Sequence, residues 1–379
     1  MFSSAPEPRR TDVTSTTTNP EPTLLLLSPT SGFGGGVERV MAAVEDAWPG
    51  RVVRVDMYRR DRTRRAYGQP TLKVGFVIRA IWTFARARPQ LVLAGHLGQL
   101  PVAALLALRR PLALWGHGRE VWPKLPWWER FLVRRCARIL TSSAFTAREL
   151  SARAGAPRDR FTPVPLPIGR SFDAVLEDPE GKSSDGRPPI LLSVSRVVPE
   201  CRYKGLFLTA EAMPEIIERR PDVRWVVVGA GADLPLLARR VEELGIADRV
   251  ELRGSVSEDG LLAAYREADL FVLPSHGDPD AEPPVGEGFG LVYAEAGVFS
   301  LPSLAARTGG GSLEFVEAGV TGETAPVDDP SALAGIIADL LDDDQRRMRL
   351  GRAARERVRA RHRPEEFRRA LAAAFTDSG

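Results

Sequence analysis

Short, almost continuously apolar segments alternate with helical stretches along most of the 379-residue chain. The apolar segments are too short for helices, and they lack the polar alternation of a strand with one face in water. Strands that are apolar on both sides belong to parallel sheets covered by helices on both faces. The alternation therefore predicts a doubly wound α/β fold, and this feature limits the possible architectures more than any other.

The alternation occurs twice. In the first half, the predicted strands cover residues 23–29, 52–58, 90–94, 112–116, 139–142 and 161–165, with helices at 37–47, 72–88, 126–137 and 144–154. In the second half, they cover residues 190–195, 224–229, 250–254, 270–274 and 302–305, with helices at 206–220, 234–244, 260–268 and 291–299. We therefore predict two Rossmann-like domains, each built on a parallel sheet, that face each other across a cleft. Ligands bind at the carboxyl ends of strands in such folds.

A polar segment separates the two halves. Residues 173–189 are rich in Asp, Glu, Gly, Ser and Pro, which is typical of an interdomain linker. We therefore expect a first domain over residues 23–172 and a second over 190–379. The second ends in Arg-rich helices over residues 329–375, whose end is a candidate for crossing back to the first. The Ser/Thr/Pro-rich residues 1–22 have no signal-peptide core and are predicted to be a disordered tail.

Charge is divided unevenly between the halves. The net charge is only +3, but residues 1–185 hold 28 basic and 17 acidic side chains, and the remainder holds 24 and 32. Basic and aromatic residues mix at 59–65, 76–88 and 122–135, a pattern that suits an anionic membrane surface. A buried core helix at 72–88 with solvated arginines is the alternative. We expect a cytoplasmic protein, with peripheral contact at the inner face of the membrane as a hypothesis.

Composition excludes several other classes of protein. Two cysteines cannot build a disulfide scaffold, and neither they nor the four histidines have the spacing of a metal site, so no metal is predicted. No apolar run reaches the roughly 18 residues that a membrane span needs. An acidic second half without a basic groove interleaved with aromatic residues argues against nucleic acid as a partner.

Glycine-rich turns follow several predicted strands. Gly34-Gly35-Gly36 follows the first strand and opens a helix, and His117 stands between two glycines after the fourth strand. Gly229 and Gly231 follow the second strand of the second half. Glycines let a backbone approach a ligand closely, and a neutral His ring can donate or accept a hydrogen bond. A tight turn and a structural His are the alternatives, and His96, after the third strand, is a weaker candidate.

Two cations of the second half lie on either side of one strand-to-helix connection. Arg196 ends the first strand of that half, and Lys204 opens the following helix. Arg forks onto phosphate oxygens and Lys acts as a point charge, so the two suit a diphosphate in the cleft. Because this half is acidic, their placement is informative. A surface ion pair with Glu200 is the alternative.

The strongest signal lies in residues 286–296. Glu287 and Glu295 are eight residues apart, the first predicted on a loop and the second one to two turns into a helix. Backbone N–H groups at Gly290 and Leu291 would then point at a phosphate between the two carboxylates. Acids on both sides of a phosphate suit hydroxyl-rich groups, with ribose on one side and a hexose on the other. Solvated glutamates on a surface helix are the alternative.

Together these residues resemble family 4 of the retaining nucleotide-sugar glycosyltransferases, which have the GT-B fold. The order of the motifs, with Arg and Lys upstream of two Glu eight residues apart, is more specific than any single glycine loop. The resemblance rests on Gly34-Gly35-Gly36 with Val37-Glu38-Arg39; Gly116-His117-Gly118; Ser142-Ser143 with Phe145-Thr146; Ser195-Arg196 with Tyr203-Lys204-Gly205; Val228-Gly229-Ala230-Gly231; the segment 286–296; and Gly309-Gly310 with Gly322-Glu323.

The resemblance implies a UDP- or GDP-sugar donor in the second domain and no required cofactor. It implies that the diphosphate is held by Arg196, Lys204, Gly290 and Leu291. Glu287 would bind the donor sugar and Glu295 the ribose. His117 would contact the sugar near the reaction centre, and Gly34 and Gly35 would lie by the phosphate or acceptor. Gly229 and Gly231 would let the nucleotide approach. The candidate catalytic set is thus His117, Glu287, Arg196 and Lys204.

The implied reaction moves a hexose to a hydroxyl of a lipid, glycan or small molecule, with retention of anomeric configuration and without a metal. In this family the departing phosphate deprotonates the acceptor, so no side chain is assigned as a base, and catalysis would stabilise the leaving diphosphate electrostatically. Biosynthesis of a glycan, a glycolipid or a glycosylated natural product would fit. A glycosyl phosphorylase, a nucleotide-sugar epimerase and a non-catalytic nucleotide-sugar-binding protein are the alternatives.

The chain departs from the family pattern at two places. Seven residues, 197–203, separate Arg196 from Lys204, more than in compact members, although the Tyr-Lys-Gly ending fits a longer variant. The family's Pro-Asn-Gly-Val-Asp near the end of the first domain is replaced here by residues 167–173, Pro-Ile-Gly-Arg-Ser-Phe-Asp. The donor contact credited to that asparagine is therefore not carried over.

Overall fold

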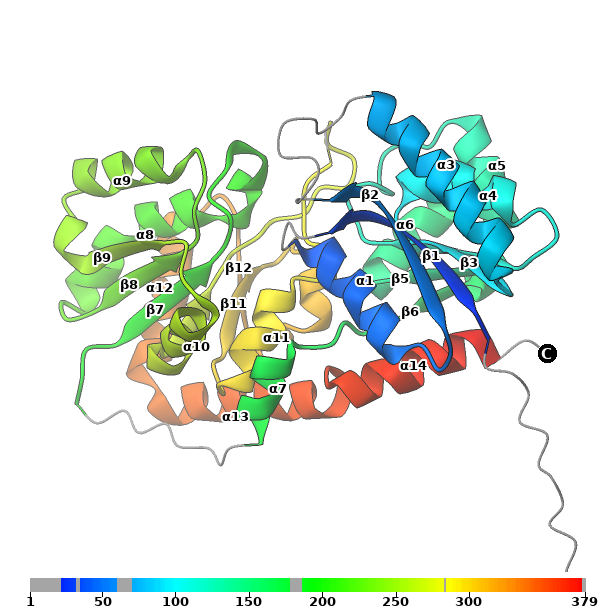
Figure 1. Cartoon of the computed structure of the whole chain (residues 1–379). Helices are drawn as coiled ribbons and strands as arrows, with labels where there is room; N and C mark the ends of the chain where they lie inside the picture. Colours follow the sequence, from blue (N-terminus) through cyan, green and yellow to red (C-terminus); the bar gives the residue numbers. More distant parts are fainter. Residues whose placement is uncertain (1–21, 32–34, 60–69, 178–185, 283, 377–379) are drawn as a thin grey trace, which may run out of the picture.

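The structure, a computed structural model, describes residues 22–31, 35–59, 70–177, 186–282 and 284–376. It forms two lobes, each built around a parallel sheet (Figure 1). The predicted tail at residues 1–22, apart from its last residue, lies outside the described residues, and so does Gly34. Within the described ranges, no helix is both long enough and apolar enough to cross a membrane.

The first sheet has six parallel strands in the order β2-β1-β3-β4-β5-β6. Its strands are β1 (Leu24–Ser31), β2 (Val52–Arg59), β3 (Leu91–Ala94), β4 (Leu112–Gly116), β5 (Arg138–Thr141) and β6 (Phe161–Pro163). Successive side chains of β1 point to opposite faces of the sheet, and all four leucines at its start are buried. Leu24 and Leu26 join one core cluster, and Leu25 and Leu27 join another. This two-sided burial explains the continuous apolar run.

The second sheet repeats the arrangement in the order β12-β11-β10-β7-β8-β9, again all parallel. Its strands are β7 (Ile190–Val194), β8 (Arg224–Val228), β9 (Val250–Gly254), β10 (Leu270–Val272), β11 (Ser303–Ala306) and β12 (Gly322–Ala325). The predicted α/β architecture of two doubly wound parallel sheets is confirmed. Strand β12 was not predicted, because it is only four residues long and its Glu and Thr are half-buried at the sheet edge.

Helices connect the strands of both sheets. In the first half they are α1 (Gly36–Ala47), α3 (Pro70–Ala87), α4 (Leu100–Leu106), α5 (Trp127–Arg135), α6 (Ala144–Ala154) and α7 (Arg170–Leu176). In the second half they are α8 (Leu206–Arg219), α9 (Leu234–Glu243), α10 (Glu258–Glu267), α11 (Leu291–Val298), α12 (Pro330–Asp342), α13 (Asp344–Arg361) and α14 (Pro364–Thr376). The seven-residue helix α4 was not predicted, because its sequence lacks a polar face.

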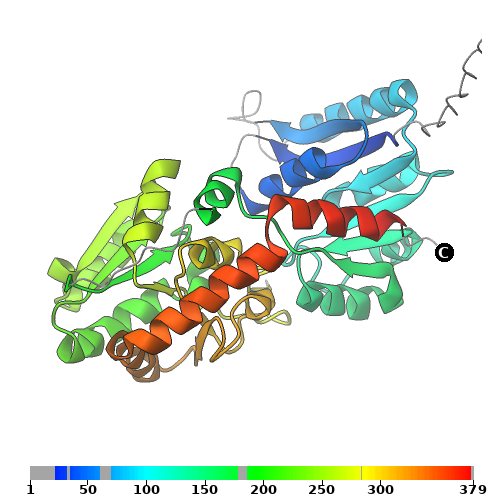
Figure 2. The ribbon, with the colours of Figure 1, turned by 90° about the horizontal axis from the view of Figure 1, so that it is seen from below.

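The last helix crosses back to the first lobe. Helix α13 runs beneath the second domain and α14 continues beneath the first, as Figure 2 shows from below. Helix α14 packs against α1 and β5. There the Arg138 Nε atom donates to the Ala374 carbonyl at 3.0 Å, and the Trp48 ring meets the Phe375 ring edge to face. The end of the chain therefore ties the two domains together.

The segment between the two sheets contains structure that was not predicted. Helix α7 covers the first residues of the segment 173–189 that we interpreted as a linker, and residues 178–185 lie outside the described part. Phe172 of α7 is buried and meets the Tyr265 and Phe299 rings of the second domain edge to face. The domain boundaries themselves stay a prediction.

Candidate active site

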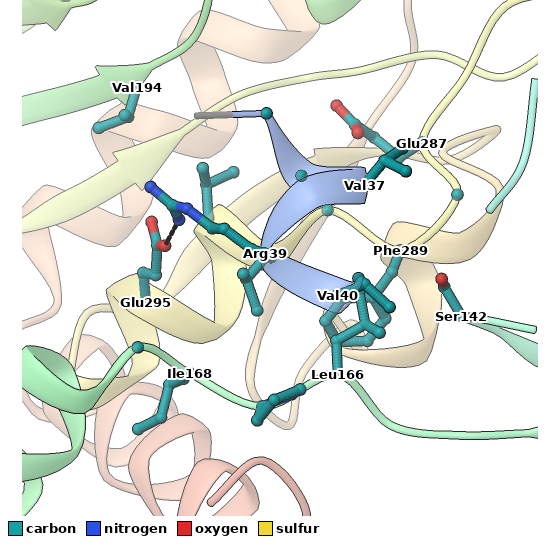
Figure 3. Close-up of a pocket in the computed structure, with 18 of the residues that line it drawn as sticks. Val37, Arg39, Val40, Ser142, Leu166, Ile168, Val194, Glu287, Phe289 and Glu295 are labelled. Atoms are coloured by element: carbon teal, nitrogen blue, oxygen red, sulfur yellow. Dashed lines mark hydrogen bonds and ion pairs between the residues drawn. The ribbon is translucent and has the colours of Figure 1, made fainter. Parts of the chain in front are cut away.

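A cleft of about 1150 Å³ lies between the two domains. It is bounded by turns at the carboxyl ends of β4, β7 and β8 and by the first turns of α1 and α11 (Figure 3). The structure brings most of the predicted site residues to its walls: Gly35, His117, Arg196, Lys204, Gly229, Glu287, Gly290, Leu291 and Glu295. Residues separated by up to 260 positions thus share one site.

Lys204 meets a carboxylate of the same site. A short 3₁₀ turn, Pro199–Lys204, follows Arg196 and places the Lys204 ammonium 2.7 Å from Glu287 Oε1. Both side chains are largely buried. Burial opposes the charge of Lys204, but the Glu287 carboxylate outweighs it, and the pKa of the lysine is raised. Lys204 thus pairs with Glu287, and the predicted alternative of a pair with Glu200 is wrong for this lysine.

Glu287 is held from several directions. Ser275 Oγ donates to Glu287 Oε1 at 3.2 Å, and the Glu287 carbonyl accepts from the Gly311 backbone N–H at 3.0 Å. The next residue, Gly288, touches the other domain, because a Cβ there would lie 1.9 Å from the His117 carbonyl oxygen. Only glycine lets these two loops approach so closely. The loop that carries Glu287 is therefore positioned by contacts with both domains.

Glu295 is almost completely buried, yet both of its oxygens have partners. Arg39 Nη1 of α1 lies 2.7 Å from Oε1 (Figure 3). The Tyr265 hydroxyl donates to Oε2 at 3.1 Å. Burial raises the pKa of Glu295, and Arg39 and Tyr265 counteract this. Since Arg39 comes from the first domain and Glu295 from the second, this ion pair spans the cleft.

Helix α11 begins at the cleft. Gly290, its N-cap, has φ of +80°, a conformation that glycine adopts without strain. A Cβ at this position would also lie 2.7 Å from the Tyr293 ring. The first backbone N–H groups of a helix have no partner within that helix, and its N-terminus favours negative charge. This end of α11 therefore offers donors to an anion between Glu287 and Glu295.

Arg196 differs from Lys204 in its surroundings. Its side chain is exposed at the cleft wall, and no described carboxylate pairs with its guanidinium. A guanidinium with open donors can fork onto two oxygens of a phosphate. Of the two cations predicted for the diphosphate, Lys204 is therefore already engaged and Arg196 is open.

His117 has a defined tautomer in the structure. Its Nε2 lies 2.8 Å from the Gly95 carbonyl oxygen. A carbonyl can only accept, so Nε2 carries the proton, and Nδ1 of the neutral ring is free of one. Burial lowers the pKa of His117 although Glu120 lies nearby. The ring is therefore neutral near pH 7 and presents a hydrogen-bond acceptor.

Two glycines and one histidine that were identified from the sequence have structural roles. A Cβ at Gly229 would lie 1.7 Å from the Ser195 carbonyl oxygen, so Gly229 allows two loops to pack at the cleft wall. Gly231 is not among the residues lining the cleft, and a Cβ there would lie 2.1 Å from the Val197 carbonyl oxygen. His96 accepts from the Gly98 N–H at 3.0 Å, which caps a short turn.

Two arginines of the site received no role from the sequence. Arg39 stands three residues after the glycine loop in the first motif, but nothing in its neighbourhood along the chain indicates Glu295. Arg119 directly follows the Gly-His-Gly turn, and its Nε donates to the Pro284 carbonyl at 2.8 Å while its guanidinium lies over the Tyr203 ring. Its position at a strand end, next to His117, was the available signal.

Family models match both halves of the chain. The model described as Glycosyltransferase Family 4 matches residues 34–171, and the model described as Glycosyl transferases group 1 matches residues 176–357. These two segments carry nearly all of the motifs on which the sequence resemblance rests.

Curated relatives are similar over most of the chain. A GDP-mannose-dependent alpha-(1-6)-phosphatidylinositol monomannoside mannosyltransferase of Mycolicibacterium smegmatis is 32% identical over 286 residues, covering 73% of this chain and 71% of the relative. A D-inositol 3-phosphate glycosyltransferase of Xylanimonas cellulosilytica is 34% identical over 205 residues, covering 53% of this chain and 45% of the relative.

Solved structures share the fold at low identity. The Anabaena protein HepE in complex with UDP-glucose superposes with a TM-score of 0.70 at 19% identity, over 94% of this chain and 99% of that one. Sucrose-phosphate synthase from Thermosynechococcus elongatus superposes with a TM-score of 0.71 at 20% identity, over 93% and 98%. These likenesses establish the GT-B arrangement of two facing domains.

Proposed function

Because this chain belongs to the family 4 glycosyltransferases, an enzyme family with the GT-B fold, we propose that it transfers a hexose from a nucleoside diphosphate sugar to an acceptor hydroxyl with retention. One observation carries the proposal: the cleft gathers two cations, the N-terminus of α11 and the carboxylates Glu287 and Glu295. A diphosphate flanked by two hydroxyl-rich groups is complementary to that set.

The proposed donor is GDP-mannose. Its support is the similarity, at 32% identity, to relatives named as GDP-mannose-dependent mannosyltransferases. UDP-sugars are the competing donors from the sequence, and HepE was solved with UDP-glucose, but at 19% identity that likeness speaks for the fold alone. Ribose would bind at Glu295, the diphosphate at Arg196, Lys204 and the start of α11, and the hexose at Glu287.

In the proposed reaction, the bond between the anomeric carbon and the β-phosphate oxygen breaks while the acceptor oxygen bonds to the same face of that carbon. The acceptor proton passes to the departing diphosphate. Arg196 and Lys204 stabilise the negative charge that grows on this leaving group. An ammonium has three donors, so Lys204 can keep Glu287 and still bind a phosphate oxygen. The neutral His117 ring would accept a hydrogen bond from the sugar.

The proposed acceptor is a hydroxyl of a phosphorylated cyclitol, carried by a lipid. The named acceptors of the similar proteins, a phosphatidylinositol monomannoside and an inositol 3-phosphate, support this class. A glycan or a small molecule would be the other outcome of an acceptor screen. The proposed location is the cytoplasmic side of the membrane that holds such a lipid.

Thermal shift with GDP, UDP and ADP is the first test. Selective stabilisation by GDP would support the proposed donor, and stabilisation by UDP instead would replace it. The absence of any shift would count against the nucleotide site. Mass spectrometry of products from a panel of donors and acceptors would then identify the transfer, and undiminished transfer in EDTA would support metal independence.

A further inference from the structure

Most of the exposed apolar surface is gathered on one side of the first domain. In the described part of the chain, twelve large hydrophobic side chains are exposed. Eight of them belong to α3, α4 and α5, and a ninth, Leu108, lies two residues after α4. We call this set the outer face: Val74, Ile78, Ile81, Trp82, Leu105, Leu108, Trp127, Trp128 and Phe131. Helix α4 contacts both α3 and α5, so the three helices form one continuous surface. Figure 1 shows that α3, α4 and α5 lie on the side of the first domain away from the second domain.

Helix α3 shows that this exposure is not a by-product of core packing. One side of the helix is satisfied, because Phe76 and Ala80 are buried against the sheet. A second apolar stripe, at positions 74, 78, 81 and 82, follows helical spacing on the solvent side. Trp82 is 64% exposed, so the sequence-based alternative of a buried core helix is wrong for this stripe. Contiguous exposed apolar patches of this kind mark interaction surfaces.

The same region is strongly basic. Residues 70–135 contain eleven Lys or Arg and two acidic residues, Glu120 and Glu129. Glu120 lies at the cleft, where it accepts from the His117 backbone N–H at 2.5 Å. Lys73, Arg86 and Arg109 are exposed beside the apolar residues, and no described carboxylate forms an ion pair with them. The charge on this surface is therefore available to an anionic partner.

The combination selects the partner. A symmetric dimer through this face would place basic surface against basic surface, with almost no acid in the region to compensate. An anionic bilayer instead takes apolar and aromatic side chains into its interface and attracts Lys and Arg with its surface charge. Exposed Trp residues at the centre of such a face suit the boundary between headgroups and acyl chains.

The outer face is also connected to the cleft. Glu120 lines the cleft, and the chain runs from it directly to Trp127, which is 79% exposed. At about 3.6 Å per residue, this segment spans at most about 25 Å. A bilayer in contact with Trp127 would therefore lie within about 25 Å of the Glu120 backbone at the cleft.

We propose that α3, α4 and α5 form a docking surface for an anionic phospholipid bilayer, with Trp82 and Trp127 as its inserted side chains. Docking brings the first domain, and with it the mouth of the cleft, to a membrane-resident acceptor. The proposal relies on the proposed function only for the nature of that acceptor. Binding to vesicles without any donor tests it independently.

The test is sedimentation of the full chain with vesicles at low and high salt. Vesicles of phosphatidylcholine alone are compared with vesicles that also contain phosphatidylglycerol. We expect binding to the anionic vesicles only, weakened by salt. The double substitution Trp82→Ser/Trp127→Ser should lower the partition coefficient about tenfold or more, and so should Arg86→Glu/Arg109→Glu. Lipids with brominated chains should quench tryptophan fluorescence of the unsubstituted protein.

Matched controls lie on the second domain. Leu236 and Met348 are exposed to 40% and 43%, and Leu236→Ser/Met348→Ser should leave vesicle binding unchanged. An unaltered thermal shift with GDP would show that the outer-face variants still fold. Equal binding to neutral vesicles, or retained binding by both outer-face variants, would overturn the proposal. So would a dimer that dissociates when the two tryptophans are replaced.

Discussion

Arg39 Nη1 of α1 and Glu295 Oε1 of α11 lie 2.7 Å apart, although 256 positions separate the two residues in the chain. The contact joins the two domains across the cleft. It also occupies the carboxylate to which we assign the donor ribose, whose second oxygen already accepts from Tyr265. Each carboxylate oxygen has two lone pairs, so a ribose diol at Glu295 would compete with Arg39 and Tyr265 for its acceptor sites.

Replacing Arg39 should strengthen nucleotide binding. The Arg39 side chain is half exposed and Glu295 is buried, so Arg39 can turn into solvent while Glu295 stays in the site. Arg39→Ala removes this competitor, and we expect the Kd for GDP to fall about two- to fivefold when titrated by calorimetry. Burial raises the pKa of Glu295 and Arg39 counteracts this, so the measurement belongs at alkaline pH, which favours the charged carboxylate. Arg219→Ala, which breaks an exposed pair within α8, is the control. A higher Kd in Arg39→Ala would instead show that this arginine helps to hold the nucleotide.

Glu287→Gln should separate binding from transfer. The amide keeps the shape of the side chain and can still bond to Ser275, so we expect the fold to be kept and GDP affinity to change little. Thermal stability should fall, because the buried Lys204 ammonium loses its counter-charge. The amide lacks the charge that accepts from sugar hydroxyls and balances Lys204, so kcat should fall about 100- to 1000-fold. Glu200→Gln, at an exposed acid near Lys204, should leave kcat unchanged. Full activity in Glu287→Gln or Glu287→Ala would remove Glu287 from the site.

Gly288→Ala should force the domains apart. Its Cβ would lie 1.9 Å from the His117 carbonyl oxygen, a contact that only movement of a loop can relieve. We expect far-UV circular dichroism to be preserved and kcat/KM to fall at least about 100-fold, since a displacement near 1 Å at a reacting centre costs that much. In Gly335→Ala on α12, the nearest atom to the new Cβ is the tip of Arg219 at 3.9 Å, so this control should be neutral or slightly stabilising.

Acid should destabilise the protein through His362. This buried ring bonds through Nδ1 to the Leu166 carbonyl oxygen, and burial lowers its pKa from 6.5 to about 4. Between pH 6.5 and about 4, His362 is protonated in the unfolded chain but stays neutral in the folded chain. The free energy of unfolding therefore decreases as the pH falls through this range. The loss approaches about 3 kcal/mol near pH 4. Urea unfolding of His362→Gln should show a shallower decline between pH 6.5 and 4 than the unsubstituted protein. Parallel pH profiles would contradict this role.

Local sequence patterns predicted most elements of the fold. Strand β4 was predicted with the bounds that the structure shows, because a strand buried on both faces is a continuous apolar run closed by glycine. Helix α6 was equally clear, since Ser143 caps its start and Gly155 ends it in a left-handed conformation. Strand β12 and helix α4 escaped, because an edge strand and a short helix without a polar face carry weak periodicity.

The candidate site was predictable to a similar degree. Arg196, Lys204, Glu287 and Glu295 were identified because residues in turns at the carboxyl ends of parallel strands converge on one edge of a sheet. Gly231 was placed in the same group, but its missing side chain makes room for the Val197 backbone instead. A glycine in a turn does not by itself reveal whether it makes room for a ligand or for another loop.

The sequence by itself determined the two sheets, their order along the chain and the set of polar residues available to the cleft, since all of these follow from neighbours within a few residues. Tertiary structure decided the partners: Arg39 with Glu295, Arg119 with the Pro284 carbonyl, and α14 against α1. It also decided that Trp82 faces solvent, because the number of neighbours around a helix is set by packing. Contacts across a cleft depend on how two rigid domains dock, and no periodicity along the chain encodes that geometry.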